Sequence, residues 1–491
     1  MRRSSQIVTL LIVVLFAGSV FASGVALTGI GARAMALGGN FRGIADDWSA
    51  MFWNPAGLTQ IKGFHFGFST EAIMVGANYT FLNHPTMPFS VFRSGETEKE
   101  SKTHLIPAAG FVYGTEKMSF GLGIYVPFGL GAKWNVLNTS SYNPAYPEID
   151  HEDDLKVIAI QPTVAFKLGD KLSVGLGVNL TLADIIIRKP TLTPNSVIFD
   201  PNYAALRGAF QAYGLTPLLG STYNHIVTEQ ELTGDGMGFG VNFGIQYDVT
   251  EDLTVGISGV YYNTIGLDGN INATTYGAVA DAALVGGLDQ LLDGMIAQGM
   301  MSAADKAQIM AIYSGQKIVR YSDAKGDADL PLPMTVGFGL AYKGIEKLLV
   351  SADVSWTQWS SWDVIEIAME DGSKSELVEN WEDGIRMGLG LEYSLTEQLA
   401  FRAGYYTEPA APPDETITIV IPDAGRRHSA NFGFSYNFGL FKLFASYEHL
   451  LIGDRDVANW EFNPGANGFD NMAGKFKTSS SNLMAGLNFN F

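Results

Sequence analysis

The sequence is first informative in what it lacks. It has no cysteine, so disulfides and thiol chemistry are excluded. Charged residues make up only 16%, and 31 basic against 50 acidic side chains leave no basic stripe to neutralise phosphates, which argues against a nucleic-acid partner. Beyond the N-terminus no run of about 18 uninterrupted apolar residues occurs, which argues against a helical membrane protein.

The N-terminus has the features of an export signal. Arg2 and Arg3 precede an apolar stretch over residues 7–20, and Val20-Phe21-Ala22 places small residues where a signal peptidase reads. We therefore expect residues 1–22 to be a signal peptide. An uncleaved anchor is the alternative, but the apolar run is shorter than the roughly 20 residues that span a bilayer.

The abundant features are glycine, aromatic residues and period-two alternation. Leu176, Val178 and Leu180 alternate with Gly177 and Asn179, and similar patterns begin at Met237 and Ile385. Segments of about 10 residues with this pattern are typical of a transmembrane β-barrel. Besides the α-helix, a closed barrel is the structure that satisfies every backbone hydrogen-bonding group in lipid. We count about 14 such strands. The predicted fold is all-β, a 14-stranded antiparallel barrel over residues 63–491; a soluble β-sandwich is the alternative.

Short and long connections alternate along the predicted barrel, as they do between the periplasmic turns and extracellular loops of outer-membrane proteins. The longest predicted loops cover residues 188–234 and 272–330. Helical spacing appears at 203–213 and 274–313, and Ser302 with Asp305 resembles a capping box. The apolar helix faces could pack loop on loop, or they could form a groove that collects ligand.

Residues 31–58 fit neither a strand nor a long helix. Five glycines punctuate short apolar pieces, and Asn54-Pro55 ends a helical turn. An even strand count puts both chain ends on the periplasmic side. We therefore expect residues 23–62 to form a hatch inside the barrel.

Two strands carry special signals. Pro127, followed by Phe128 and Gly129, interrupts the third strand, since proline cannot donate to a ladder. This predicts either a strand end or a gap in the wall. The last strand alternates up to Phe491, a C-terminal pattern that we expect the outer-membrane assembly machinery to recognise.

An ordered set of motifs resembles one known family, the FadL/TodX-type outer-membrane transporters of long-chain fatty acids and aromatic hydrocarbons. The set comprises Gly31 to Gly39, Ala45-Asp46-Asp47, Trp53 to Leu58, Tyr125 to Leu130, Asp353 to Trp359, Asn380 to Asp383, Phe401 to Tyr405, and Ile421-Pro422-Asp423 with Arg426 and Arg427. The resemblance implies a monomer in the bacterial outer membrane, among lipid and lipopolysaccharide. It also implies a hatch displaced by ligand and sideways exit at the third-strand kink.

The same resemblance places Asn54, Pro55 and Ala56 near the ligand, and Phe52 and Trp53 are further candidates for an aromatic one. Strand parity points Arg386, Arg402, Arg427 and Lys442 into the lumen. These cations could bind a fatty-acid carboxylate, or they could pair with lumen acids and hold the hatch to the wall.

No catalytic residue, metal ligand set or cofactor motif is predicted. His428 and Ser429 are adjacent on one strand and so face opposite sides, which argues against a lipase. A general porin or an adhesive barrel is the main alternative function.

Overall fold

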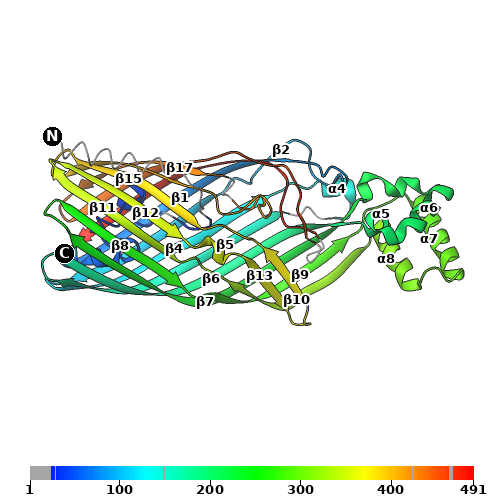
Figure 1. Cartoon of the computed structure of the whole chain (residues 1–491), viewed down its shortest axis with the longest axis horizontal. Helices are drawn as coiled ribbons and strands as arrows, with labels where there is room; N and C mark the ends of the chain where they lie inside the picture. The colour runs from blue at the N-terminus through cyan, green and yellow to red at the C-terminus, as the bar shows by residue number, and fades with distance from the viewer. Residues whose placement is uncertain (1–23, 28, 147–149, 422–424, 464–467) are drawn as a thin grey trace.

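The computed structural model describes residues 24–491 except residues 28, 147–149, 422–424 and 464–467. The predicted signal peptide therefore lies outside the described residues. From Gly63 onward the described residues form a closed β-barrel, because the first strand pairs with the last (Figure 1). β1 (Gly63–Phe81) and β22 (Gly474–Asn490) are antiparallel, from His65 opposite Asn490 to Phe81 opposite Gly474. This pairing removes the two outer edges that an open sheet would have.

Over the described residues the wall consists of 14 antiparallel strands, which confirms the predicted fold class. Four of them are interrupted and carry two labels each. In chain order after β1 they are β3 (Thr103–Gly114), β4 (Met118–Trp134), β5 (His151–Leu168), β6 (Leu172–Pro194), β7 (His225–Asp248), β8 with β9 (Leu253–Tyr262, Ile265–Tyr276), β10 with β11 (Lys317–Leu330, Thr335–Ile345), β12 with β13 (Leu348–Thr357, Val364–Met369), β14 with β15 (Lys374–Val378, Gly384–Ser394), β16 (Leu399–Glu408), β17 (Arg427–Asn437), β18 (Phe441–Ile452) and β22.

The alternation of side chains follows the predicted parity. Leu176, Val178 and Leu180 are exposed on the outer surface, whereas Gly177, Asn179 and Thr181 are buried inside. An apolar outer surface suits lipid, and small or polar inner residues leave room in the lumen.

The long loops are shorter than the predicted ranges 188–234 and 272–330. β6 continues to Pro194 and β7 begins at His225, while β9 continues to Tyr276 and β10 begins at Lys317. These extensions are rich in Thr, Lys, Glu and Gln and lack the apolar alternation that marks a strand facing lipid. Backbone pairing carries the strands onward regardless of that pattern, as the β6–β7 register down to Pro194 and His225 shows.

The long-loop end of the barrel carries the helices, opposite the C-terminus (Figure 1). They are α4 (Thr139–Tyr142), α5 (Ser196–Phe199), α6 (Ala204–Ala212), α7 (Ala282–Ala297) and α8 (Ala303–Tyr313). Phe210 of α6, Leu288 and Leu292 of α7 and Ile309 of α8 pack into one apolar cluster. Most of the apolar helix faces are therefore used in loop-on-loop packing.

Polar contacts fix the ends of these helices. The capping box predicted at the start of α8 is present, with Ser302 and Asp305 bonding each other's backbone. Hydrogen bonds to Asp289 and Asp293 of α7 raise the pKa of Lys306 and tie the two helices together. Among the described residues no helix is both long enough and apolar enough to cross a membrane.

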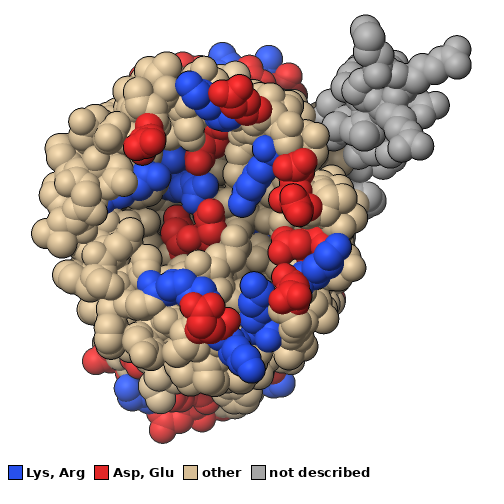
Figure 2. All heavy atoms as spheres, turned by 90° about the vertical axis from the view of Figure 1, so that its left-hand side faces the viewer, with Lys and Arg blue, Asp and Glu red and all other residues tan. Residues whose placement is uncertain are grey.

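The opposite end, with the short turns, presents acidic and basic side chains side by side around a hollowed face (Figure 2). Lys62 and Glu116, for example, pair there at 3.3 Å. Neither sign of charge dominates this face.

Candidate functional site

The N-terminal segment 24–62 lies inside the barrel, and we call it the plug. It contains α2 (Ala32–Ala36), α3 (Ala50–Trp53) and the 3-10 helix η1 (Pro55–Gln60), and nearly all of its apolar side chains are buried. Glycines of the wall make room for it. A Cβ at Gly67 would lie 1.8 Å from Trp48, and one at Gly110 would lie 2.6 Å from Met51. The lumen-facing glycines are therefore a matched surface for the plug.

The predicted hatch residues 52–56 are held against the wall. Asn54 donates hydrogen bonds to the carbonyls of Arg42 and Ile245 at 3.0 and 3.1 Å, and its side-chain oxygen accepts from the Ala56 N–H at 3.2 Å. Trp53 donates to the Ile30 carbonyl at 2.8 Å. Phe52 makes an edge contact with Tyr125 at 5.5 Å between ring centroids. These residues thus brace the plug, and Phe52 reaches the cavity described below through Tyr125.

The predicted lumen arginines have separate roles. Glu392 of β15 accepts hydrogen bonds from Arg33 of the plug and from Arg402 of β16, both at 2.7 Å, and Arg33 also pairs with Asp46. The Arg402 side chain is fully buried. A buried carboxylate shared by two guanidiniums fastens the plug to the wall, since removing one partner would leave buried charge uncompensated.

Arg386 and Arg42 add to this fastening. Arg386 donates to the Gly38 carbonyl at 2.8 Å and stacks its guanidinium over the Tyr406 ring. Arg42 of the plug pairs with Asp353 of β12 at 2.9 Å. Lys442 lies over the Phe444 ring. Of the three arginines predicted as ligand-binding cations, Arg427 is the one that lines the main cavity, a space of about 500 Å³ described below.

The barrel wall is incomplete between β3 and β4, in the described part of the chain. Their pairing ends at Ala109 opposite Ile124. Further along, backbone hydrogen bonds from the Glu100 N–H to the Lys133 carbonyl, at 2.9 Å, and from the Arg93 N–H to the Val136 carbonyl, at 2.8 Å, join the two segments again. We call the unpaired stretch, residues 103–108 of β3 and 125–132 of β4, the window. It contains Pro107 on one side and Pro127 on the other, and neither can donate to a ladder.

On its other edge β4 carries a bulge at the same place. The register with β5 shifts between Tyr125 and Phe128, so that one extra residue of β4 is accommodated at Val126-Pro127. A bulge bends a strand and re-aims its side chains. The predicted kink residues Pro127, Phe128 and Gly129 therefore lie at the edge of the window.

The first residues of the plug occupy this edge. The Leu27 N–H donates to the Pro127 carbonyl at 2.9 Å, and the Gly129 N–H donates to the Val25 carbonyl at 3.0 Å, with Ala26 opposite Phe128. Residues 25–27 thus pair with β4 as a short extra strand. Arg427 on the far wall donates to the Gly24 carbonyl at 3.1 Å.

A cavity of about 500 Å³ adjoins the window and the start of the plug. Its lining is mostly apolar and includes lumen-facing side chains such as Ile73, Ile106 and Tyr125. It also includes Leu105 and Ile124, which are 68% and 47% exposed on the outer surface. One cavity therefore touches both the lumen and the lipid-facing side of the wall.

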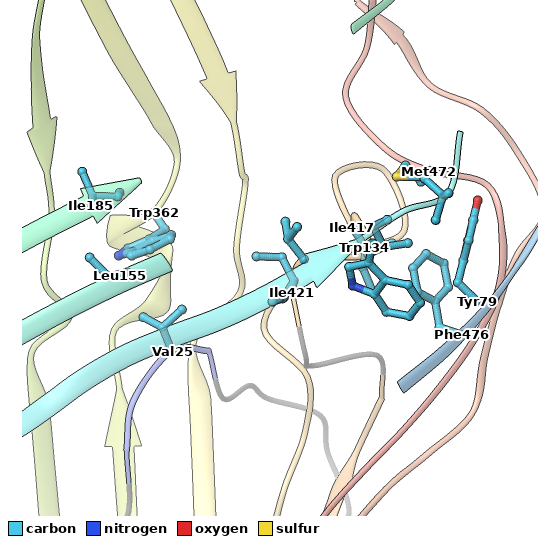
Figure 3. Packing of buried hydrophobic residues seen from close by; sticks show 14 of the residues in the cluster. Val25, Tyr79, Trp134, Leu155, Ile185, Trp362, Ile417, Ile421, Met472 and Phe476 are labelled. Carbon is cyan, nitrogen blue, oxygen red and sulfur yellow. The ribbon is translucent and has the colours of Figure 1, made fainter. Parts of the chain in front are cut away.

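Toward the loop end the lumen is packed with apolar side chains. Trp134, Tyr79, Phe476 and Met472 gather on one side, and Trp362 lies beside Leu155 and Ile185 on the other (Figure 3). A smaller cavity of about 100 Å³ shares Leu130, Leu155 and Ile421 with the larger one. The route from the loops into the main cavity is therefore narrow, and its apolar lining is interspersed with charged side chains such as Asp153, Lys189 and Glu379.

Three features of this site were not predicted from the sequence. Pro107 carries the same signal as Pro127, a proline inside an alternating segment. Glu71 falls on the lumen side of β1 by parity, with Ser69 and Ile73. Residues 24–27 gave no signal, because their strand-like pairing depends on an unpaired edge that is distant in sequence.

Comparison with known proteins agrees with this architecture. The family model described as "Outer membrane protein transport protein (OMPP1/FadL/TodX)" matches residues 13–491. An outer membrane protein of Neisseria meningitidis serogroup B is 25% identical over 84% of this chain and 82% of its own length. Outer membrane protein P1 of Haemophilus influenzae is 24% identical over 80% of this chain and 78% of its own length.

Solved structures show the same fold. The crystal structure of a Pseudomonas aeruginosa FadL homologue has a TM-score of 0.69 at 16% identity and covers 96% of this chain and 100% of its own. That of the P. putida toluene transporter TodX has a TM-score of 0.64 at 16% identity, covering 96% and 99%. The family consists of transporters rather than enzymes. The chain is a member of the OMPP1/FadL/TodX family of outer-membrane transport proteins.

Proposed function

We propose that the protein takes up hydrophobic small molecules, such as long-chain fatty acids or aromatic hydrocarbons, across the outer membrane. Ligand enters from the extracellular loop end and occupies the 500 Å³ cavity. It leaves sideways through the window when residues 24–27 withdraw from β4. The observation that carries this proposal is the cavity's lining, which joins lumen-facing residues to Leu105 and Ile124 on the outer surface.

We also propose roles for the other parts of the chain. Residues 1–22 are an export signal, 23–62 a hatch and 63–491 the barrel, which works as a monomer in contact with lipid and lipopolysaccharide. Its C-terminal strand, ending in Phe491, is the signal that the outer-membrane assembly machinery recognises. The relatives described as a toluene transporter and a FadL homologue support a hydrophobic substrate. A general porin is disfavoured because a free aqueous path is at odds with a lumen full of plug side chains.

A reversible lock tests the lateral route. Ala26 and Phe128 are bridge partners in antiparallel pairing, close enough for a disulfide. Because the chain has no cysteine, the double variant Ala26→Cys, Phe128→Cys gives a single defined crosslink. We expect oxidised protein in liposomes to lose uptake of laurate and toluene, and a reductant to restore it.

A control disulfide should leave transport unchanged. Thr335 and Thr357 already face each other across paired wall strands, so crosslinking Thr335→Cys with Thr357→Cys changes nothing that must move. Full uptake by the oxidised Ala26–Phe128 protein would refute the withdrawal of residues 24–27.

A further inference from the structure

The main cavity contains a buried carboxyl group with an unsatisfied oxygen. Glu71 of β1 is 1% exposed and lines the cavity, and its Oε2 has no hydrogen-bond partner among the described residues. Leaving a carboxylate buried without a partner costs several kcal/mol. Both of its oxygens face Gly29 of the plug, where an added Cβ would overlap Oε2. A displacement of the start of the plug would therefore open this unsatisfied acceptor to a ligand in the cavity.

The neighbouring charges determine which ligand group fits. Glu448 also lines the cavity, but its two oxygens accept from Ser429 and Asn482 at 2.7 and 2.8 Å. Arg427 of β17, which also lines the cavity, already donates to the Gly24 carbonyl and pairs with Glu408 at 3.6 Å. A ligand carboxylate beside Glu71 would therefore meet two acidic groups and a cation that is already engaged.

The cavity's lysines lie elsewhere along its length. Lys99 is placed opposite Ala77 by a backbone hydrogen bond, six residues along β1 from Glu71. At about 3.3 Å per residue this is a separation of roughly 20 Å. Lys102 is 61% exposed at its side chain and pairs with Asp154. Lys156 lies opposite Gly129 at the window, but its side chain is exposed on the outer surface, between buried Leu155 and Val157. The lumen-side charged groups near Glu71 are therefore Glu448 and the engaged Arg427.

Resting on the proposed uptake function, we propose that Glu71 accepts a hydrogen bond from the ligand's head group, so that the preferred substrates are hydrophobic alcohols, phenols or amines rather than carboxylates. The shared chemistry is a hydrogen-bond donor on an apolar body. A hydroxyl group and a protonated amine both supply it.

Four ligands with the same chain test this: dodecane, dodecanol, dodecylamine and dodecanoate, radiolabelled and bound at pH 9 to protein in maltoside micelles, with protein-free micelles as the blank. We expect dodecanol or dodecylamine to bind about tenfold more tightly than dodecanoate, the effect of one hydrogen bond to a charged group. Dodecane binding tests the proposed uptake function on its own, and its absence would refute that function.

Two variants separate the head groups. Glu71→Gln keeps an acceptor but removes the charge, so it should weaken dodecylamine about tenfold and leave dodecanol within twofold. Glu71→Leu removes the acceptor and should weaken both. Unchanged dodecane binding shows that the cavity is intact in each variant, and Glu116→Gln, on an exposed turn, is the matched control. Dodecanoate binding as tight as dodecanol, or dodecanol binding that Glu71→Leu leaves unchanged, would overturn the proposal.

Discussion

The backbone N–H of Leu27 donates to the carbonyl of Pro127 at 2.9 Å and joins the start of the plug to β4, the kinked third strand of the wall. This hydrogen bond connects two segments about a hundred residues apart in sequence. It also places the plug across the window, where the wall lacks its own pairing. Plug and window are therefore one mechanical unit, and changes in either should alter transport.

Removing the plug should open the barrel. Deleting residues 23–58 takes away α2, α3 and most of η1, and it leaves the polar lumen surface to water. We expect large, stable single-channel currents in planar bilayers from the deletion protein and little conductance from the intact one. A large open pore in the intact protein would contradict the plug's sealing role and favour a general porin.

Restoring a hydrogen-bond donor to the window should slow transport. Pro107→Val combined with Pro127→Val supplies an N–H on each side of the unpaired stretch, so that β3 and β4 can extend their ladder. We expect uptake of a hydrophobic probe to fall several-fold while barrel assembly, followed by heat-modified electrophoretic mobility, is unchanged. Pro162→Val is the matched control, because Pro162 is also a strand proline but pairs with Leu122 within the intact wall. Wild-type uptake by the double variant would argue against exit at the window.

Breaking the shared carboxylate should loosen the plug rather than change ligand choice. Arg402→Ala leaves Glu392 with Arg33 alone, whereas Glu392→Gln leaves two buried guanidiniums without their common partner. We expect Glu392→Gln to have the larger effect, about 3 kcal/mol of stability, with flickering conductance in bilayers.

The ligand profile distinguishes this from a binding role for Arg402. Because Arg402 does not line the main cavity, its replacement should change laurate and toluene binding equally. Selective loss of laurate binding by Arg402→Ala would instead assign the carboxylate site to this arginine.

A methyl group placed inside the wall should displace the plug. In Gly67→Ala the new Cβ would meet the Trp48 ring at 1.8 Å, whereas Gly76 on the same strand has no atom within 4 Å of its would-be Cβ. We expect Gly67→Ala to make the N-terminal segment accessible to added protease and Gly76→Ala to behave as wild type. Equal protection of both variants would show that the plug tolerates a shift at Trp48.

Much of this architecture can be predicted from the sequence, because lipid imposes a period-two pattern that single residues display. Leu176, Val178 and Leu180 alone give the outward face of β6. The extensions of β6 to Pro194 and of β10 back to Lys317 were not predictable in this way, since their outward side chains are mostly polar and show no apolar alternation. The helices of the loop end followed from their apolar spacing and from the Ser302 cap.

The site was less predictable, because its parts meet only in three dimensions. The alternation along the strands predicted that Arg402 and Arg427 point into the lumen. It did not predict that Arg402 shares Glu392 with Arg33, or that Arg427 lines the main cavity. Pro127 indicated an irregular strand. The window itself depends on Pro107 in the adjacent strand and on residues 25–27 pairing across the gap.

The seam between β1 and β22 dictates an order of events during biogenesis. Ribosomes make the plug before any strand of the wall, yet its enclosing cylinder is sealed only when the final strand pairs with Gly63–Phe81. Until that moment Trp48, Met51 and their neighbours have no complete surface to pack against. The plug must therefore be protected by another protein, or already packed against the partly formed wall, before the last strand pairs. Each finished barrel contains one plug, because plug and wall belong to the same polypeptide.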